Sequence, residues 1–335
     1  ISSVDLVVAV SAAGGLGSFG AHHLDAAGIR DTAAAIRART GRPFAFNLWV
    51  PLDGTDEPAG AGADFERGAD LLEPFFRELG VARPAPPPRF TPPYAEQVEA
   101  VLAARPAVFS FVFGIPDADV LRRCRELGIS TLGTATSVDE ARALAAAGVD
   151  MIVASGFEAG GHRVSFLKRP EDSLAGTLSL VPQIVDAVRV PVLAAGGIAD
   201  GRGIAAAMML GAQGVQIGTA FLACRESNAG DAHRRMLFSP AARETALTRA
   251  FSGRLARGIR NRMLAELEPH AGRVAPYPIQ NWLTGQLKRA AREQERPDLM
   301  SLWCGQSAGL LAHRDAASLM SALVADTSRL LAGAG

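Results

Sequence analysis

The sequence predicts an α/β fold, a (β/α)8 TIM barrel with a C-terminal helical cap segment. Between residues 94 and 217, stretches with helical spacing alternate with short apolar runs, which is the pattern of right-handed βαβ units around a parallel sheet. Glycine-rich turns follow three of these runs, at Gly156, Gly196 and Gly218, and the turns after barrel strands are where this fold builds its active sites. The length of 335 residues suits one large barrel or two smaller domains.

The first 50 residues contain two predicted helices and two predicted strands. Ser3 is a plausible N-cap for the first helix, and Gly14 and Gly15 end it. The expected elements are a helix over residues 4–12, a very short strand over 16–19, a helix over 29–39 and a strand over 44–50. Residues 51–93 then interrupt the alternation with Pro and Gly clusters and one helix around 65–79. We interpret this stretch as an excursion over the barrel mouth.

After residue 93 the alternation becomes regular. The expected helix–strand pairs are 94–104 with 108–113, 118–127 with 130–133, 138–147 with 151–154, 178–188 with 192–195, and 201–210 with 214–217. This gives seven strands in all, whereas a closed barrel has eight. We therefore expect the first strand to be missing from the given chain, before Ile1. Residues 1–221 should form the barrel domain, and residues 222–335 a mostly helical cap on the substrate side with closing helices.

Composition and charge narrow the classes of function. Hydrophobic residues make up 48% and charged residues 20% of the chain, which is enough for a substantial core and unlike a disordered protein. The formal net charge is zero, so neither a nucleic acid nor an anionic membrane is an expected partner. No apolar run approaches the ~20 residues of a membrane span. The three cysteines are far apart, which fits a cytoplasmic location and forms no metal or redox motif.

The most informative stretch is residues 150–163. The apolar run at 151–154 predicts a strand buried on both faces, and a turn with Gly156, Gly160 and Gly161 follows it and ends at His162. A histidine just past the carboxyl end of a buried parallel strand is well placed for proton transfer, because its ordinary pKa lies near neutrality. The alternative is a histidine that only caps a loop.

Two further glycine turns predict a phosphate site. Gly196 and Gly197 follow the strand at 192–195, and Ala199 or Asp200 should begin a helix whose free N–H groups point into the mouth. Gly218 follows the next strand. Loops after the last two strands of a barrel, together with a helix N-terminus, recurrently bind phosphate. The alternative is a pair of tight turns without a ligand. The phosphate could belong to a substrate or to a cofactor.

Several motifs together resemble one known family. They are GFEAGGHR, LAAGGIADGRG and QIGTAFL, with SAAGGLGS, PFAFNLWVP, GTATSVDEA, YPIQNWLTG and SLWCGQSAGL elsewhere in the chain. They resemble the larger bacterial class of the nitronate monooxygenase family, formerly called 2-nitropropane dioxygenases. The resemblance covers essentially the whole chain. It implies an FMN-containing TIM barrel that oxidises alkyl nitronates, or nitroalkanes, with O2 to a carbonyl compound and nitrite or nitrate.

The resemblance also implies roles for individual residues. His162 matches the active-site histidine of the family. The residues that match flavin or phosphate contacts, or lie directly beside them, are Asn47, Thr134, Ser155, Ala159, Gly161, Ala195, Gly196, Gly197, Gln216, Gly218 and Thr219. Asn47 matches the asparagine near the pyrimidine end of the flavin ring, and Gly197, Gly218 and Thr219 match the phosphate site. No metal ligand is implied.

The chain departs from the family pattern at several positions. Ser155 stands where many members carry glutamine, Val164 replaces a usual glycine, and Thr134 stands where some members have lysine. Val112 occupies the place of a second histidine, which puts a two-histidine mechanism in doubt. The opening strand of the family, with a methionine near the flavin, is absent from the given chain.

Two other functions stay open. The first is an NAD(P)H-using reductase similar to FMN-dependent enoyl-acyl-carrier-protein reductase, which also carries an AGGH loop. The second is a flavin-binding protein without turnover. In either case we expect a monomer or a homodimer with a small-molecule ligand. Of the remaining residues, His22 and His23 are expected to be solvated. Tyr277, Trp282 and Trp303 are expected to serve mainly in packing, although a helical cap over the barrel mouth would bring one or two of them near the flavin. The arginines of residues 254–262 are expected to form a solvated basic face.

Overall fold

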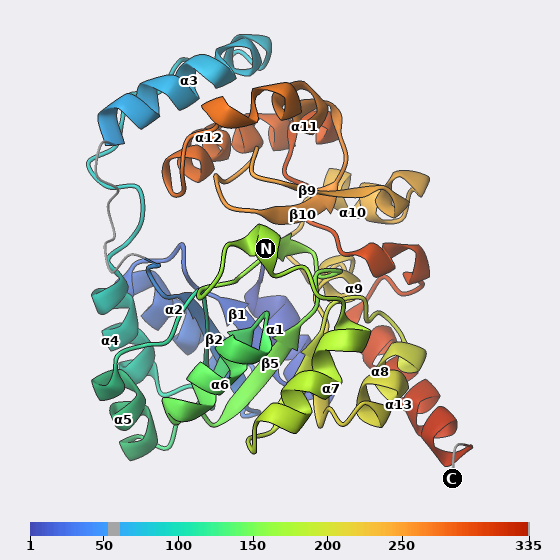
Figure 1. Cartoon of the computed structure of the whole chain (residues 1–335). Helices are drawn as coiled ribbons and strands as arrows, with labels where there is room; N and C mark the ends of the chain where they lie inside the picture. The colour runs from blue at the N-terminus through green and yellow to red at the C-terminus, as the bar shows by residue number, and fades with distance from the viewer. Residues whose placement is uncertain (53–60, 334–335) are drawn as a thin grey trace.

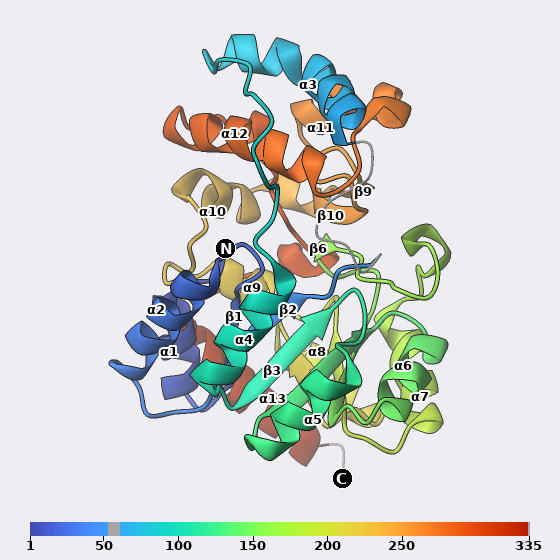
Figure 2. The ribbon, with the colours of Figure 1, turned by 90° about the vertical axis from the view of Figure 1, so that its left-hand side faces the viewer.

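The barrel sheet in this computed structural model has seven parallel strands in sequence order. The structure describes residues 1–52 and 61–333. The strands are β1 (Gly17–Gly20), β2 (Phe44–Trp49), β3 (Val108–Val112), β4 (Ser130–Ala135), β5 (Met151–Ser155), β7 (Val192–Ala195) and β8 (Gly214–Gln216). They curl into a half-barrel surrounded by helices (Figures 1 and 2). This confirms the predicted fold class and all seven expected strands.

The two edges of this sheet are β1 and β8, which are not paired with each other in the described part of the chain. Between them lies an apolar cavity of about 540 Å³, lined by Val7 of the first helix, Val215 of β8 and Leu323 of the last helix, among others. A closing strand ahead of Ile1 remains a prediction.

Eight helices cover the outside of the half-barrel. They are α1 (Val4–Ala12), α2 (Ala26–Arg37), α4 (Tyr94–Ala104), α5 (Ala118–Glu126), α6 (Val138–Ala146), α7 (Thr177–Ala187), α8 (Gly201–Met209) and α13 (Ala316–Ala332). Several begin at a side-chain cap that accepts a backbone N–H, as Ser3 does for α1 and Ser137 for α6, because the first N–H groups of a helix have no partner within it. The helix α13 packs on α1 and α8.

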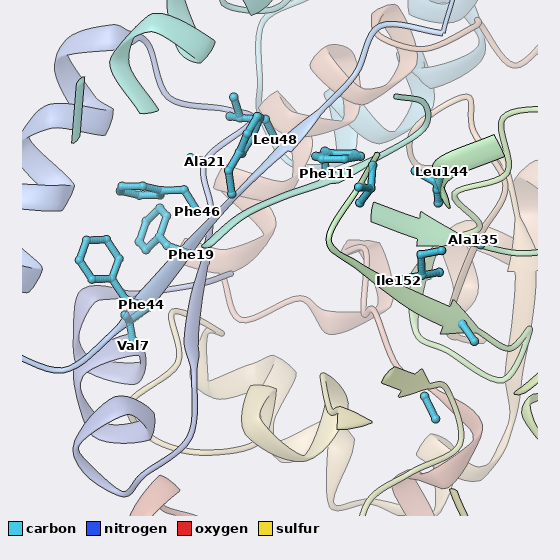
Figure 3. Close-up of a cluster of buried hydrophobic side chains, with 14 of the residues drawn as sticks. Val7, Phe19, Ala21, Phe44, Phe46, Leu48, Phe111, Ala135, Leu144 and Ile152 are labelled. Carbon is cyan, nitrogen blue, oxygen red and sulfur yellow. The ribbon is translucent and has the colours of Figure 1, made fainter. Parts of the chain in front are cut away.

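The barrel core lies between the strands and this helical layer. Phe46 of β2, Phe111 of β3 and Ile152 of β5 are fully buried there, as are Leu144 of α6 and Val7 of α1 (Figure 3). Parallel strands covered on both faces have near-continuous apolar sequences, which is why the runs FAFNLW and VFSFV could be identified from sequence.

Four helices lie together beyond the carboxyl ends of the strands (Figures 1 and 2), and a second apolar cluster lies among them. Its helices are α3 (Ala61–Glu78), α10 (Asp231–Leu237), α11 (Arg262–Leu267) and α12 (Ile279–Glu293). Helices α3 and α12 pack on each other, and Leu72, Phe76, Leu283 and Leu287 are buried in the cluster. We call these helices and the strands that join them the cap segment. The domain boundaries at residues 221 and 222 remain a prediction, and residues 53–60 of the predicted excursion lie outside the described residues.

The cap segment also contains strands that the sequence analysis missed. β9 (Thr245–Thr248) and β10 (Ala256–Ile259) pair antiparallel, and β10 also pairs with the two-residue strand β6 (Gly161–His162). Each is very short, and β10 includes an arginine and a glycine, so neither shows the apolar alternation that predicts a strand. None of the helices within the described ranges is long and apolar enough to cross a membrane.

The helix α7 allows a matched test of the core. Leu180 is 2% exposed and packs in the barrel core, whereas Leu178, on the same helix, is 70% exposed. We expect Leu180→Ala to lower the free energy of unfolding by about 2–5 kcal/mol, because it removes buried methyl groups and leaves a cavity. Leu178→Ala should change it by less than about 0.5 kcal/mol. Urea denaturation measures both, and equal losses would show that this face of α7 does not carry the core.

Candidate functional site

A cavity of about 400 Å³ opens at the carboxyl ends of the barrel strands and brings together most of the predicted site residues. Its size lies within the range of roughly 300–1,000 Å³ that is usual for small-molecule and cofactor sites. The predicted residues that line it are Thr134, Ser155, Ala159, Gly161, His162, Ala195, Gly196, Gly197, Gln216, Gly218 and Thr219. The residues predicted from four different strands and their turns therefore meet at one place.

Asn47 is the one predicted cofactor contact that does not line this cavity. It lies in β2 opposite Ser110 of β3, and its Nδ2 donates a hydrogen bond of 2.9 Å to the Ser110 hydroxyl. A hydrogen bond within the sheet is the other role that a polar residue in an otherwise apolar strand can have. Its contact with a flavin ring remains a prediction.

The glycine turns leave open space where side chains would otherwise project. Gly161 has a φ of +78°, in the left-handed region that favours glycine. A Cβ added at Gly161 or at Gly218 would meet no atom within 4 Å. Among the described residues that line the cavity, none carries a charged side chain. An anionic ligand group would therefore be held by backbone N–H groups and hydroxyls.

The helix α8 does not offer the free N–H groups that the sequence suggested. Asp200 is its N-cap, and the carboxylate of Asp200 accepts hydrogen bonds from the N–H groups of Arg202 and Gly203. Gly218 and Thr219, at the start of the short helix α9 (Thr219–Leu222), do line the cavity. The phosphate prediction thus rests on the turns themselves rather than on α8.

His162 contacts both the barrel and the cap segment. It lies in β6 opposite Ala256 of β10, and its Nε2 is 2.7 Å from the hydroxyl of Ser252. Its ring packs at 4.8 Å from Trp49 and 5.4 Å from Trp303, measured between ring centroids. This burial, with a smaller effect of the Arg254 charge, lowers the pKa of His162 to about 3. The imidazole is therefore neutral at pH 7 and has a lone pair to accept a proton.

Arg163, next to the histidine, is a buried structural residue. It is 4% exposed, and its guanidinium donates to the carbonyls of Ser155, Thr136 and Ser173. These contacts fix the end of β5 against the loop that leads to α7. Burial lowers the pKa of Arg163 to about 10, so it keeps its charge at neutral pH. In the sequence this residue stands out only as the end of the GFEAGGHR motif.

A loop from the cap segment closes one side of the cavity. Trp303, Gly305 and Ser307 line the cavity. The N–H of Gly305 donates to the hydroxyl of Thr219 at 2.9 Å, and the N–H of Gln306 donates to the carbonyl of Glu158 at 3.0 Å. Trp303 both packs and faces the cavity. Ser252 and Ser307 carried no sequence signal, because single serines are common at turns.

Two expectations about charged and polar residues are wrong. His22 is not solvated: its ring stacks on Trp49 at 3.9 Å, and burial lowers its pKa well below the ordinary value. The arginines of residues 254–262 do not form one solvated face either. Arg257 is 3% exposed and donates to the carbonyl of Phe157, and Arg254 lies over the rings of Phe113 and Tyr277. The strand β10, which contains Arg257, is paired with β6 on one side and β9 on the other.

The low pKa of His162 has a measurable effect on stability. Between pH 6.5 and about 3 the unfolded chain binds a proton at this residue that the folded protein does not bind. The free energy of unfolding should therefore decrease as pH falls through this window, by at most about 1.4 kcal/mol per pH unit for this residue. In His162→Gln the decrease between pH 7 and pH 5 should be smaller by up to about 2 kcal/mol. Urea denaturation at both values tests this, and an unchanged pH dependence would contradict it.

The comparisons with known proteins agree with one another. A model of the family described as nitronate monooxygenase matches residues 1–326. A probable nitronate monooxygenase from Staphylococcus aureus (strain MRSA252) is 40% identical over 328 residues, which are 97% of this chain and 91% of that protein. The structure of nitroalkane oxidase from Streptomyces ansochromogenes matches with a TM-score of 0.92 and 37% identity, over 100% of this chain and 94% of that chain. FabK from Thermotoga maritima matches with a TM-score of 0.76 and 26% identity, over 99% and 91%.

Proposed function

This chain belongs to the nitronate monooxygenase family of oxidoreductases, and on this basis we propose that it oxidises alkyl nitronates with dioxygen in a flavin-dependent reaction. The products would be a carbonyl compound and nitrite or nitrate. The observation that carries the proposal is the cavity itself, in which His162 and the glycine turns of three strands face one space. Such a constellation at the carboxyl end of a barrel is the expected place for catalysis.

FMN is the cofactor that we propose for this cavity. Gly161 and Gly218 leave open space where a Cβ would lie, and the uncharged lining suits a phosphate held by N–H groups and by the Thr219 hydroxyl. The two turns after β7 and β8 form one phosphate site, which favours a mononucleotide. When bound, FMN would supply an electron acceptor that dioxygen can reoxidise. The ten predicted cofactor contacts that line the cavity are the proposed contacts, with Asn47 as a further one.

His162 is the proposed base for neutral nitroalkanes. A nitronate is already an anion and brings no proton to remove, whereas a nitroalkane must first lose its α-proton. The imidazole is neutral and lines the cavity, so it has a lone pair for this proton. Its low pKa makes it a weak base in the empty site, and the negative charge that forms on the substrate beside it would raise that pKa as the proton is transferred. A general-base role is worth typically 10²–10⁴-fold in rate. The charge of Arg254, which is close enough to lower the pKa of His162, also favours an anion in the same space.

A second candidate is an NAD(P)H-using reductase of the enoyl-acyl-carrier-protein reductase type. The AGGH loop at Ala159–His162 favours it, because such reductases carry the same loop. For either reaction we propose a monomer or homodimer. All three cysteines are unpaired and buried, which supports the proposal of a cytoplasmic location.

Oxygen uptake distinguishes the two candidates and tests His162. With a primary nitronate the purified protein should consume O2 and release nitrite or nitrate, and His162→Asn should retain most of this activity. With the neutral nitroalkane the same variant should lose about 10²–10⁴-fold, because the base is gone.

Flavin content of the variant must be matched to the wild type by absorbance. Equal losses on both substrate forms would mean that His162 orients the ligand and moves no proton. Rapid NADPH oxidation with an enoyl thioester, without O2 uptake on nitronates, would favour the reductase instead.

Gly218 offers a test of the cofactor site that does not depend on activity. Gly218→Leu places a side chain into open cavity space, and the φ of −102° at this position is compatible with leucine. We expect a folded protein that binds FMN at least 10-fold more weakly, because the side chain occupies the cofactor space. Gly285→Leu is the control, since Gly285 also has no atom near its Cβ position but lies on the exposed side of α12.

Flavin released by heat and identified by mass should be FMN in wild type and in the Gly285 control. Release of FAD would contradict FMN as the cofactor. Normal FMN binding by Gly218→Leu would place the cofactor elsewhere.

A further inference from the structure

Ser252 lies in the cap segment and is fixed in place by that segment. It is fully buried in the turn between β9 and β10. The residues before it are held from α12: Gln280 donates to the carbonyl of Ala250 at 2.7 Å, and Thr284 donates to the carbonyl of Phe251. The hydroxyl therefore reaches His162 from a rigid turn 90 residues further along the chain.

The hydroxyl of Ser252 has three contacts and a single proton to give. Its oxygen is 2.7 Å from Nε2 of His162, 3.1 Å from the carbonyl oxygen of Arg254 and 3.3 Å from the backbone nitrogen of Arg254. The carbonyl can only accept and the backbone N–H can only donate. If Ser252 donates to the carbonyl, its two lone pairs accept from the Arg254 N–H and from Nε2–H, and all three hydrogen bonds form. If Ser252 donates to Nε2 instead, the contact with the carbonyl is lost.

We propose that Ser252 is a positioning residue that holds His162 as the Nε2–H tautomer, so that Nδ1 is the atom that accepts the substrate proton. The inference deepens the proposed function and rests on it. In the step itself the Cα–H bond of a nitroalkane breaks, its electron pair stays on the substrate as the nitronate, and the proton forms a bond to Nδ1. The resulting imidazolium keeps its Nε2–H bond to Ser252, whose oxygen stabilises the new positive charge in a site without a carboxylate among its described lining residues.

The tautomer can be observed directly, without any turnover. In holoenzyme labelled with 15N-histidine, at pH 7, the His162 resonances, assigned by their loss in His162→Asn, should show a protonated Nε2 and an unprotonated Nδ1. In Ser252→Ala they should shift toward a mixture of the two tautomers. Ser252→Thr, which keeps the hydroxyl, should restore the wild-type pattern.

Kinetics supply the second measurement. Ser252→Ala should lower kcat for a neutral nitroalkane by roughly 5- to 10-fold, the effect of losing one hydrogen bond, and leave turnover of the nitronate within about 2-fold. Ser173→Ala is the control, because Ser173 is also buried and its hydroxyl has no hydrogen-bond partner within the described residues.

Three outcomes would overturn the inference: a protonated Nδ1 in the wild type, an unchanged tautomer in Ser252→Ala, or equal losses on both substrate forms with flavin retained. Because the spectrum needs no substrate, a protein that turned over no nitronate at all would still confirm or refute the tautomer. Failure of the proposed function is thereby separated from failure of the inference.

Discussion

The pairing of β6 with β10 is the contact on which the site depends. After β5 the chain enters a glycine turn whose peptide groups would be costly to bury without partners. The cap segment supplies the partners: Gly161 and His162 pair with Arg257 and Ala256, and the N–H of Arg163 donates to the carbonyl of Leu255. The turn is therefore held against the cap segment with its backbone groups paired, His162 is half-buried there, and desolvation lowers the pKa of that histidine. The same pairing of β6 with β10 thus fixes the turn in place and affects the pKa of His162.

The charges of this region are arranged one layer behind the cavity. Glu158 accepts hydrogen bonds from the N–H and hydroxyl of Thr177 at the start of α7. Glu140, fully buried, accepts from the backbone of Thr136, Phe166 and Leu167. Arg163 is saturated by carbonyls in the same way. Each charge holds a loop in place and is neutralised by backbone dipoles there, which leaves the cavity wall uncharged and suited to a ligand that brings its own charge.

Strands and turns that depend on local residue patterns could be predicted from the sequence. Contacts between segments far apart in the chain could not. The barrel strands could be found because each is apolar on both faces and is followed by a helix of ordinary length. The turns of Gly196 and Gly218 could be placed together because parallel strands end at one edge. Ser252 and Trp303 could not be linked to His162, because the cap segment that carries them has no periodicity that points to a barrel. The burial of His22 could not be predicted, since it comes from Trp49 of β2. The Nδ2 of Asn47 donates to Ser110 within the sheet, and its contact with a ligand stays a prediction.

The packing of α3 on α12 has a consequence for how the protein is made. Helix α3 leaves the barrel between β2 and β3, yet its partner α12 begins about 200 residues later in the chain. At ribosomal rates of roughly 5–20 residues per second, the apolar face of α3, with Phe65, Leu72 and Phe76, stays without its native cover for about 10–40 s of synthesis. The barrel strands can pair in order as they emerge, whereas α3 can pack on α12 only after α12 has been synthesised. Until then this face of the nascent chain is open to the non-native contacts that lead to aggregation.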